Sequence, residues 1–131
     1  MKKVIFLMIL GLGLSISFVN AQFLGYSKHE VERYIMLRSD YKLLDQELSI
    51  LGDSKVFYST PIGTIIIYYD DNICYRFMDV DSSSSERSYI SNLNRNSNLR
   101  LIGYDTWQCR DEFNIKKVRL DNTVGFIYTL L

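Results

Sequence analysis

The chain has 131 residues with 15 basic and 15 acidic side chains, a length that suits one small domain. This size excludes two independent domains and the scaffold of a large barrel enzyme. The balanced charge argues against a nucleic-acid binder, because affinity for a polyanion comes mainly from an excess of Lys and Arg. Hydrophobic residues make up 47% and charged residues 23% of the chain, a composition that favours a folded globular protein.

The first 21 residues have the three parts of a signal peptide. Met1-Lys2-Lys3 is a cationic start, and residues 4–19 are almost entirely apolar. Val19-Asn20-Ala21 follows with small side chains at the two positions that signal peptidase recognises. An uncleaved anchor is the alternative, but the apolar run falls short of the roughly 20 residues that a spanning helix needs. We expect cleavage after Ala21 and a single domain over residues 22–131 in the periplasm or outside the cell. Without Lys2 and Lys3, 13 basic residues face 15 acidic ones, a net charge of −2.

Export changes how the two cysteines are interpreted. Cys74 and Cys109 would pair in an oxidising compartment, and the bond would close a loop of 36 residues. The chain-entropy model gives such a loop roughly 3 to 4 kcal/mol of stabilisation. Two buried, unpaired thiols are the alternative. No metal site is expected, because two cysteines without clustered histidines fall short of four ligands.

The mature chain is predicted to begin with a helix. Ser27 is a hydroxyl N-cap with Glu30 three residues later, and Tyr26 and Val31 flank it as a hydrophobic staple. The helix is expected to end near Ser39-Asp40. Residues 41–44 favour a short strand, and residues 48–51 are ambiguous.

The centre predicts an antiparallel meander with strands at residues 55–60, 63–69 and 73–80, which are rich in β-branched and aromatic side chains. With Asp71-Asn72 as the central turn residues, Tyr69 pairs with Cys74 and each neighbour follows without a shift, so that Ile67 pairs with Arg76. This register places on one face Ile65, Ile67, Tyr69, Cys74, Arg76 and Met78.

The second half is predicted to repeat the order of the first. Asp81 and four serines precede a helix over about residues 84–94, followed by a strand at 99–106, a polar connection at 107–114, and a hairpin of residues 115–121 and 124–130. Lys55-Val56 and Gly63 recur as Lys117-Val118 and Gly125 at an offset of 62. The expected fold is α+β, with two helices on one face of an antiparallel sheet of about six strands, in the order helix, meander, helix, meander.

The segment Gly25-Tyr26-Ser27-Lys28-His29-Glu30-Val31 resembles the G-x-[ST]-x-x-x-V opening of the small envelope-assembly lipoproteins of the SmpA/OmlA kind. Duplicated versions of that plan look like the β-lactamase inhibitor protein. The resemblance implies helices before a β-meander and a protein-binding role, and it transfers no active site. Two departures are the missing lipid-bearing cysteine and the missing Gly-x-Pro after Leu37.

The sequence offers little for catalysis. His29 is the only imidazole and sits at the second position of a predicted helix, where a surface role is expected. Asp70-Asp71 fits a hairpin turn, and Asp81 with its serines fits a helix cap. A calcium loop counted from Asp79 lacks the required Gly and Glu. We therefore expect no enzyme, no metal and no cofactor.

Aromatic residues give the functional prediction. All ten tyrosines and Trp107 lie after the leader, and these residue types favour both strands and interfaces. We expect a non-catalytic module that binds an exported or envelope protein, inhibitor-like or assembly-like. The alternatives are a small hydrolase that uses carboxylates and a binder of small apolar ligands. The candidate partner-binding residues are Ile65, Ile67, Tyr69, Arg76, Met78 and Trp107.

Overall fold

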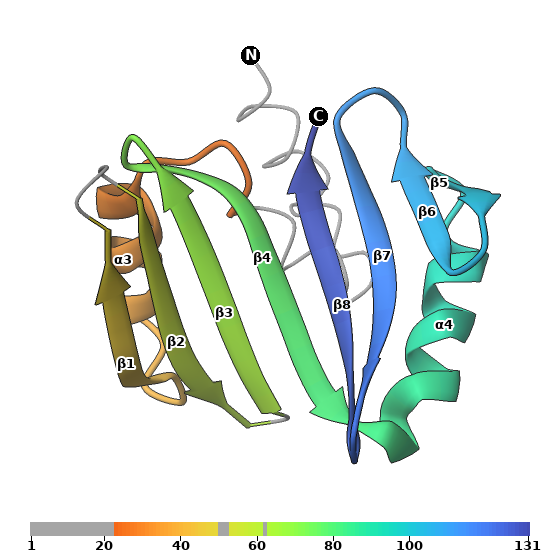
Figure 1. Ribbon diagram of the computed structural model, residues 1–131, viewed down its shortest axis with the longest axis horizontal. Coiled ribbons are helices and arrows are strands. Elements are labelled where there is room, and N and C mark those ends of the chain that lie inside the picture. The colour runs from red at the N-terminus through yellow and green to blue at the C-terminus, as the bar shows by residue number, and fades with distance from the viewer. Residues whose placement is uncertain (1–22, 50–52, 62) are drawn as a thin grey trace.

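The computed structural model describes residues 23–49, 53–61 and 63–131, which form one antiparallel sheet of eight strands and two short α-helices (Figure 1). The expected leader, residues 1–21, lies outside the described residues, as do residues 50 and 51 of the ambiguous segment 48–51. In the part of the chain that the structure describes, no helix has the length and apolar character to cross a membrane.

The elements follow in this chain order: α3 (Lys28–Met36), β1 (Lys42–Leu48), β2 (Ser54–Thr60), β3 (Gly63–Asp70), β4 (Ile73–Ser82), the 3-10 turn η1 (Ser83–Ser85), α4 (Glu86–Arg95), β5 (Leu99–Gly103), β6 (Thr106–Cys109), β7 (Phe113–Leu120) and β8 (Thr123–Leu130). The strands lie side by side in the order β1-β2-β3-β4-β8-β7-β6-β5. Strands β4 and β8 therefore form the centre, and β1 and β5 form the two edges.

Local chemistry explains two of these elements. Ser27 and Glu30 form the predicted capping box: the Glu30 N–H donates to Ser27 Oγ at 3.2 Å, and the Ser27 N–H donates to Glu30 Oε1 at 3.0 Å. Asp71 and Asn72 have φ values of 52° and 62° between β3 and β4. These residue types tolerate the left-handed region that a tight hairpin turn requires, so the predicted turn is confirmed.

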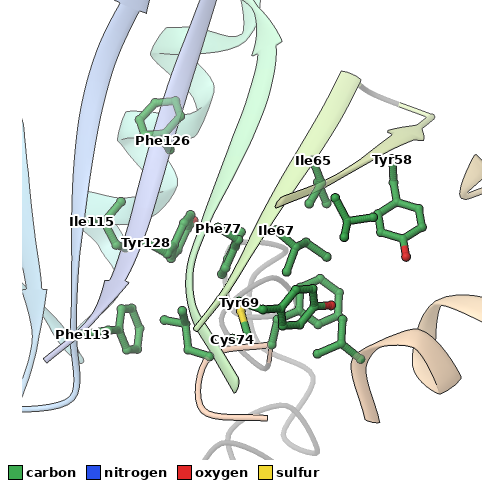
Figure 2. Close-up of a cluster of buried hydrophobic side chains, with 14 of the residues drawn as sticks. Tyr58, Ile65, Ile67, Tyr69, Cys74, Phe77, Phe113, Ile115, Phe126 and Tyr128 are labelled. Atoms are coloured by element: carbon green, nitrogen blue, oxygen red, sulfur yellow. The ribbon is translucent and has the colours of Figure 1, made fainter. Parts of the chain in front are cut away.

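One face of the sheet is covered by the helices and holds the core. Figure 1 shows both helices behind the sheet, and Val31 and Ile35 of α3 and Leu93 of α4 belong to the same buried cluster as the strands. Figure 2 shows the aromatic centre of this cluster, where the rings of Phe77 and Tyr128 stack with centroids 4.4 Å apart. We call this side the covered face.

The expected fold is wrong. The chain is mostly sheet, with eight strands and two short helices, rather than two helices on a sheet of about six strands in helix, meander, helix, meander order. The predicted polar connection at residues 107–114 contains a strand, β6, in which Trp107 and Cys109 are buried. Strand β1 extends to Leu48 and is exposed along its whole length, so it lacks the alternation that would have indicated it.

The register of the β3–β4 hairpin differs from the prediction by one residue beyond its first pair. Tyr69 does pair with Cys74, but a bulge at the next position makes Tyr68 pair with Arg76 and Ile67 with Phe77. A bulge places two residues opposite one, so every later side chain moves to the other face. Arg76 therefore leaves the face on which the sequence placed it.

The recurrence at an offset of 62 does not relate equivalent strands. It aligns Lys55 of β2 with Lys117 of β7, and Gly63 of β3 with Gly125 of β8. Strand β2 lies beside an edge strand, whereas β7 has β6 and β8 as neighbours and touches neither edge. The two short matches therefore do not mark one repeated unit of this sheet.

The expected disulfide is absent, and this expectation is corrected. Cys74 and Cys109 are both free and buried. They lie on β4 and β6, with β8 and β7 between them, a lateral separation of roughly 14 Å at the usual strand spacing. A disulfide needs Cα atoms within about 7 Å. Burial raises the pKa of Cys74 to about 12 and that of Cys109 to about 11, which keeps both thiols protonated.

Candidate functional site

The second face of the sheet has no helix over it among the described residues, and we call it the uncovered face. The strand registers and the burial pattern place alternate residues of the strands here. Its larger apolar side chains are partly exposed, in contrast to the buried side chains of the covered face. They are Phe57, Ile66, Tyr68, Tyr75, Met78, Val80, Val118 and Ile127.

Close packing around Gly125 makes part of this face continuous. A side chain on Gly125 would approach Met78 Sδ to 2.9 Å and Val118 Cγ2 to 3.1 Å, so these two side chains close over the glycine from the neighbouring strands. An apolar strip therefore runs across β4, β8 and β7 without a gap. Glycine fits here because its backbone lies beneath two larger side chains.

Beside this strip, aromatic rings alternate with cations across β2, β3 and β4. Lys55 Nζ lies 5.2 Å from the ring centroid of Phe57 and 5.3 Å from that of Tyr68. The guanidinium carbon of Arg76 lies 5.9 Å from the Tyr68 centroid and 5.6 Å from the Tyr75 centroid. These distances lie within cation–π range. We call these five residues the aromatic–cation row.

The charges of the uncovered face are mostly positive. Between β2 and β5 the registers place four basic side chains on it: Lys55, Arg76, Arg100 and Lys116. Acidic residues occur at its rim, with Asp70 at the β3–β4 turn and two more on edge strand β1, Asp45 and Glu47. This face is therefore electropositive, although the mature chain is expected to be slightly acidic.

The predicted partner-binding patch is not a surface, and this prediction is corrected. Ile65, Ile67 and Tyr69 are 2%, 0% and 0% exposed, and Trp107 is 3% exposed, all in the core of the covered face. Arg76 and Met78 lie on the uncovered face, on the other side of the sheet. The bulge in β4 separates them from the other four residues.

The sequence missed most of the row. Lys55, Phe57, Tyr68 and Tyr75 were outside the predicted patch, because the unshifted register put Arg76 on the opposite face from Tyr68. The alternation of Lys55 and Phe57 in β2 was the available signal, since both point to one side of a strand. The pairing of β2 with β3 was needed to use it.

Buried carboxyls lie on the covered face rather than in a cleft. Asp79 and Asp81 of β4 are 1% and 4% exposed. The Tyr89 hydroxyl of α4 donates to Asp79 Oδ2 at 3.1 Å and also forms a hydrogen bond with the Tyr128 hydroxyl. Burial is the largest influence on Asp81 and raises its pKa, while its hydrogen bond with Asp79 opposes this. The pair is enclosed by the protein's own groups.

Two cations of β7 on the covered side of the sheet, Lys117 and Arg119, are paired with carboxylates. Glu86 at the start of α4 binds Lys117 Nζ and an Arg119 Nη2 atom, each at 2.8 Å, and Lys117 also lies 3.4 Å from Asp105. The hydrogen bond from Lys117 lowers the pKa of Glu86. These contacts attach α4 to β7, so Lys117 and Arg119 stabilise the fold.

The remaining candidates occupy ordinary structural positions. His29 is exposed on α3, as predicted, and Asp71 is part of a turn. Among the described residues no group of three or more His, Cys, Asp or Glu side chains could hold a metal ion. A hollow of about 440 Å³ beside α3 is lined by charged and apolar residues, Tyr26, Glu30, Arg33, Tyr34, Met36 and Leu37.

The chain matches no family model, no curated protein and no solved structure. The likeness to SmpA/OmlA-like lipoproteins stays a prediction from the motif at residues 25–31. Function is therefore inferred from the residues and geometry described above.

Proposed function

We propose that this protein is a non-catalytic, exported binding module that holds another exported or envelope protein against the uncovered face of its sheet. The observation that carries the proposal is the contrast between a face closed by helices and a face that presents partly exposed rings and methyl groups. Apolar and aromatic surface of this kind favours association with another protein.

The partner is proposed to present acidic side chains around an apolar centre. Lys55, Arg76, Arg100 and Lys116 distribute positive charge over the uncovered face. Opposite charges on a partner would speed encounter and fix its orientation. The apolar strip around Gly125 would supply the area that is buried on binding.

Binding is favoured over catalysis because two of the carboxyl groups that a hydrolase could use, those of Asp79 and Glu86, are held by other side chains of the covered face. Asp79 contacts Tyr89 within the core, and Glu86 is held by Lys117 and Arg119. A hydrolase would need carboxyls that face a substrate. Export is supported by the leader pattern of residues 1–21, and it places the proposed partner in the same compartment.

Capture from the native envelope tests this proposal with matched variants. Tyr68→Ala removes a ring from the uncovered face, and Tyr104→Ala removes one that is 91% exposed at the β5–β6 turn. A hot-spot loss of about 2 kcal/mol corresponds to roughly 30-fold weaker binding. We expect Tyr68→Ala to lose the captured protein by about that factor while Tyr104→Ala retains it. Equal capture by both folded variants would refute the proposal.

A further inference from the structure

Arg76 is the cation of the uncovered face whose surroundings are most fully defined. Its guanidinium lies beside the rings of Tyr68 and Tyr75, 5.9 Å and 5.6 Å from their centroids, and the two rings are in edge contact with centroids 6.4 Å apart. The rings restrict its position and exclude water from part of its surface. A guanidinium fixed in this way keeps its hydrogen-bond donors in the plane of the group, where a carboxylate can accept two of them.

Among the described residues, the Nε–H of Arg76 has no hydrogen-bond acceptor. This Nε is buried, and within the described residues no carboxylate lies within ion-pair distance of the guanidinium. The Nε is closed to solvent, so an acceptor from outside the chain has to bind the terminal Nη groups of this partly exposed side chain.

On the covered face, two cations that attach α4 to the sheet form ion pairs with a carboxylate of the same chain. Lys117 and Arg119 both have Glu86 within 2.8 Å. Lys55 and Arg76 instead have aromatic rings beside them and no such ion pair with any described residue, although Glu47 lies opposite Lys55 in the β1–β2 register. The difference indicates that the two cations of the row are positioned for charge from another molecule.

We propose that Arg76 is the carboxylate-binding site of the uncovered face, and that it takes the side chain of a partner's Asp or Glu. The inference rests on the proposed function, because it assumes that a protein occupies this face. Tyr68 and Tyr75 orient the guanidinium, and Lys55 adds a second positive charge on the far side of the Tyr68 ring. Charge-assisted, bidentate hydrogen bonds are the strong ones, and Arg makes them where Lys cannot.

Nuclear magnetic resonance of the arginine Nε–H groups tests this site without the partner, on the protein isolated from its host. The probes are N-acetyl-glutamate N-methylamide, its glutamine analogue, and N-acetylglycine, whose carboxylate is terminal. We expect the Arg76 Nε–H signal to shift saturably with the glutamate probe and at least about tenfold more weakly with the glutamine probe. The terminal carboxylate should bind more weakly than the side-chain carboxylate.

Two variants make the assignment specific. Arg76→Lys keeps the charge but loses the planar donors, so affinity for the glutamate probe, followed in this variant on the ring signals of Tyr68 and Tyr75, should fall by about tenfold. Arg95→Gln removes an exposed cation from the last turn of α4, on the covered side of the sheet, and it should leave the affinity unchanged. Equal shifts with both side-chain probes, no shift at Arg76, or unchanged affinity in Arg76→Lys would overturn the site. Preference for the terminal carboxylate would overturn the assignment to a side chain.

The failure of this site can be told apart from the failure of the proposed function. If Tyr68→Ala loses its captured partner but Arg76 ignores the glutamate probe, the face binds protein without a carboxylate site and this inference is wrong. If Arg76 binds the glutamate probe but Tyr68→Ala captures as the native chain does, the carboxylate site stands and the proposed function is wrong.

Discussion

The two faces of this sheet are built from alternate residues of the same strands, yet they satisfy their side chains in different ways. On the covered face Tyr89 stacks on Phe126 with centroids 3.7 Å apart, and its hydroxyl is hydrogen-bonded. On the uncovered face Tyr68 contacts two cations and remains partly exposed. The comparison shows that the side chains of the covered face are packed against other parts of the chain, whereas those of the uncovered face remain partly exposed.

The β4 bulge determines which residues serve which face. Before it, Cys74 points into the core, and after it Phe77 and Asp79 do so while Arg76 and Met78 point outward. Without the bulge, Arg76 would lie among the buried residues of β3. A single inserted residue therefore brings a cation beside the two tyrosine rings.

The largest expected effect comes from the same substitution on each face. Phe77→Ala opens a cavity among stacked rings and should lower the free energy of unfolding by about 3–5 kcal/mol. Phe57→Ala, on the uncovered face, should lower it by about 1 kcal/mol, because its ring is already partly in water. Denaturant unfolding of both variants measures the difference. Equal losses would mean that both faces are packed alike.

A smaller effect is expected where the covered face buries polar groups. Tyr89→Phe removes a hydroxyl that donates to Asp79 and is hydrogen-bonded to Tyr128, and it should cost about 1–3 kcal/mol because the Asp79 carboxylate and the Tyr128 hydroxyl each lose a partner while they stay buried. Tyr104→Phe is the matched control, since that side chain is 91% exposed and should change nothing measurable. A neutral Tyr89→Phe would show that water reaches this part of the covered face.

The pH dependence of stability sharpens the comparison further. The pKa of Asp81 is raised in the folded chain, so the folded state holds its proton more tightly than the unfolded state. The resulting stabilisation is complete below about pH 4 and is lost as the pH rises through the raised pKa. Asp81→Asn should remove this contribution to the free energy of unfolding. The stability of the variant should then no longer fall between about pH 4 and the raised pKa of Asp81. Thermal unfolding between pH 4 and pH 8 measures it, and an unchanged profile would contradict the assignment.

Local patterns predicted the parts of the fold whose chemistry is local. Short segments determine three features that the sequence predicted: the capping box at Ser27, the Asp71-Asn72 turn and the strands of the central meander. Strand β1 was not readable in full, since an exposed edge strand needs no apolar alternation. Strand β6 was not predicted, because it is only four residues long and follows a turn at Asp105, whose φ is 53°.

The candidate site was harder to predict than the fold, because its residues meet only through strand pairing. Arg76 and Met78 were named from the sequence, but their companions depended on a bulge that no local pattern marks. The disulfide failed for a similar reason. Cys74 and Cys109 share a face, but the order of the strands places β8 and β7 between them.

Site-specific photocrosslinking in the native host tests the central claim most directly. p-Benzoylphenylalanine replaces Tyr68 on the uncovered face, Leu44 on edge strand β1, which is 58% exposed, or Tyr104 at the β5–β6 turn. The proposed function predicts one protein adduct from position 68 and none from positions 44 and 104. An adduct from position 44 or 104 with none from position 68 would show that the partner binds elsewhere and contradict the account.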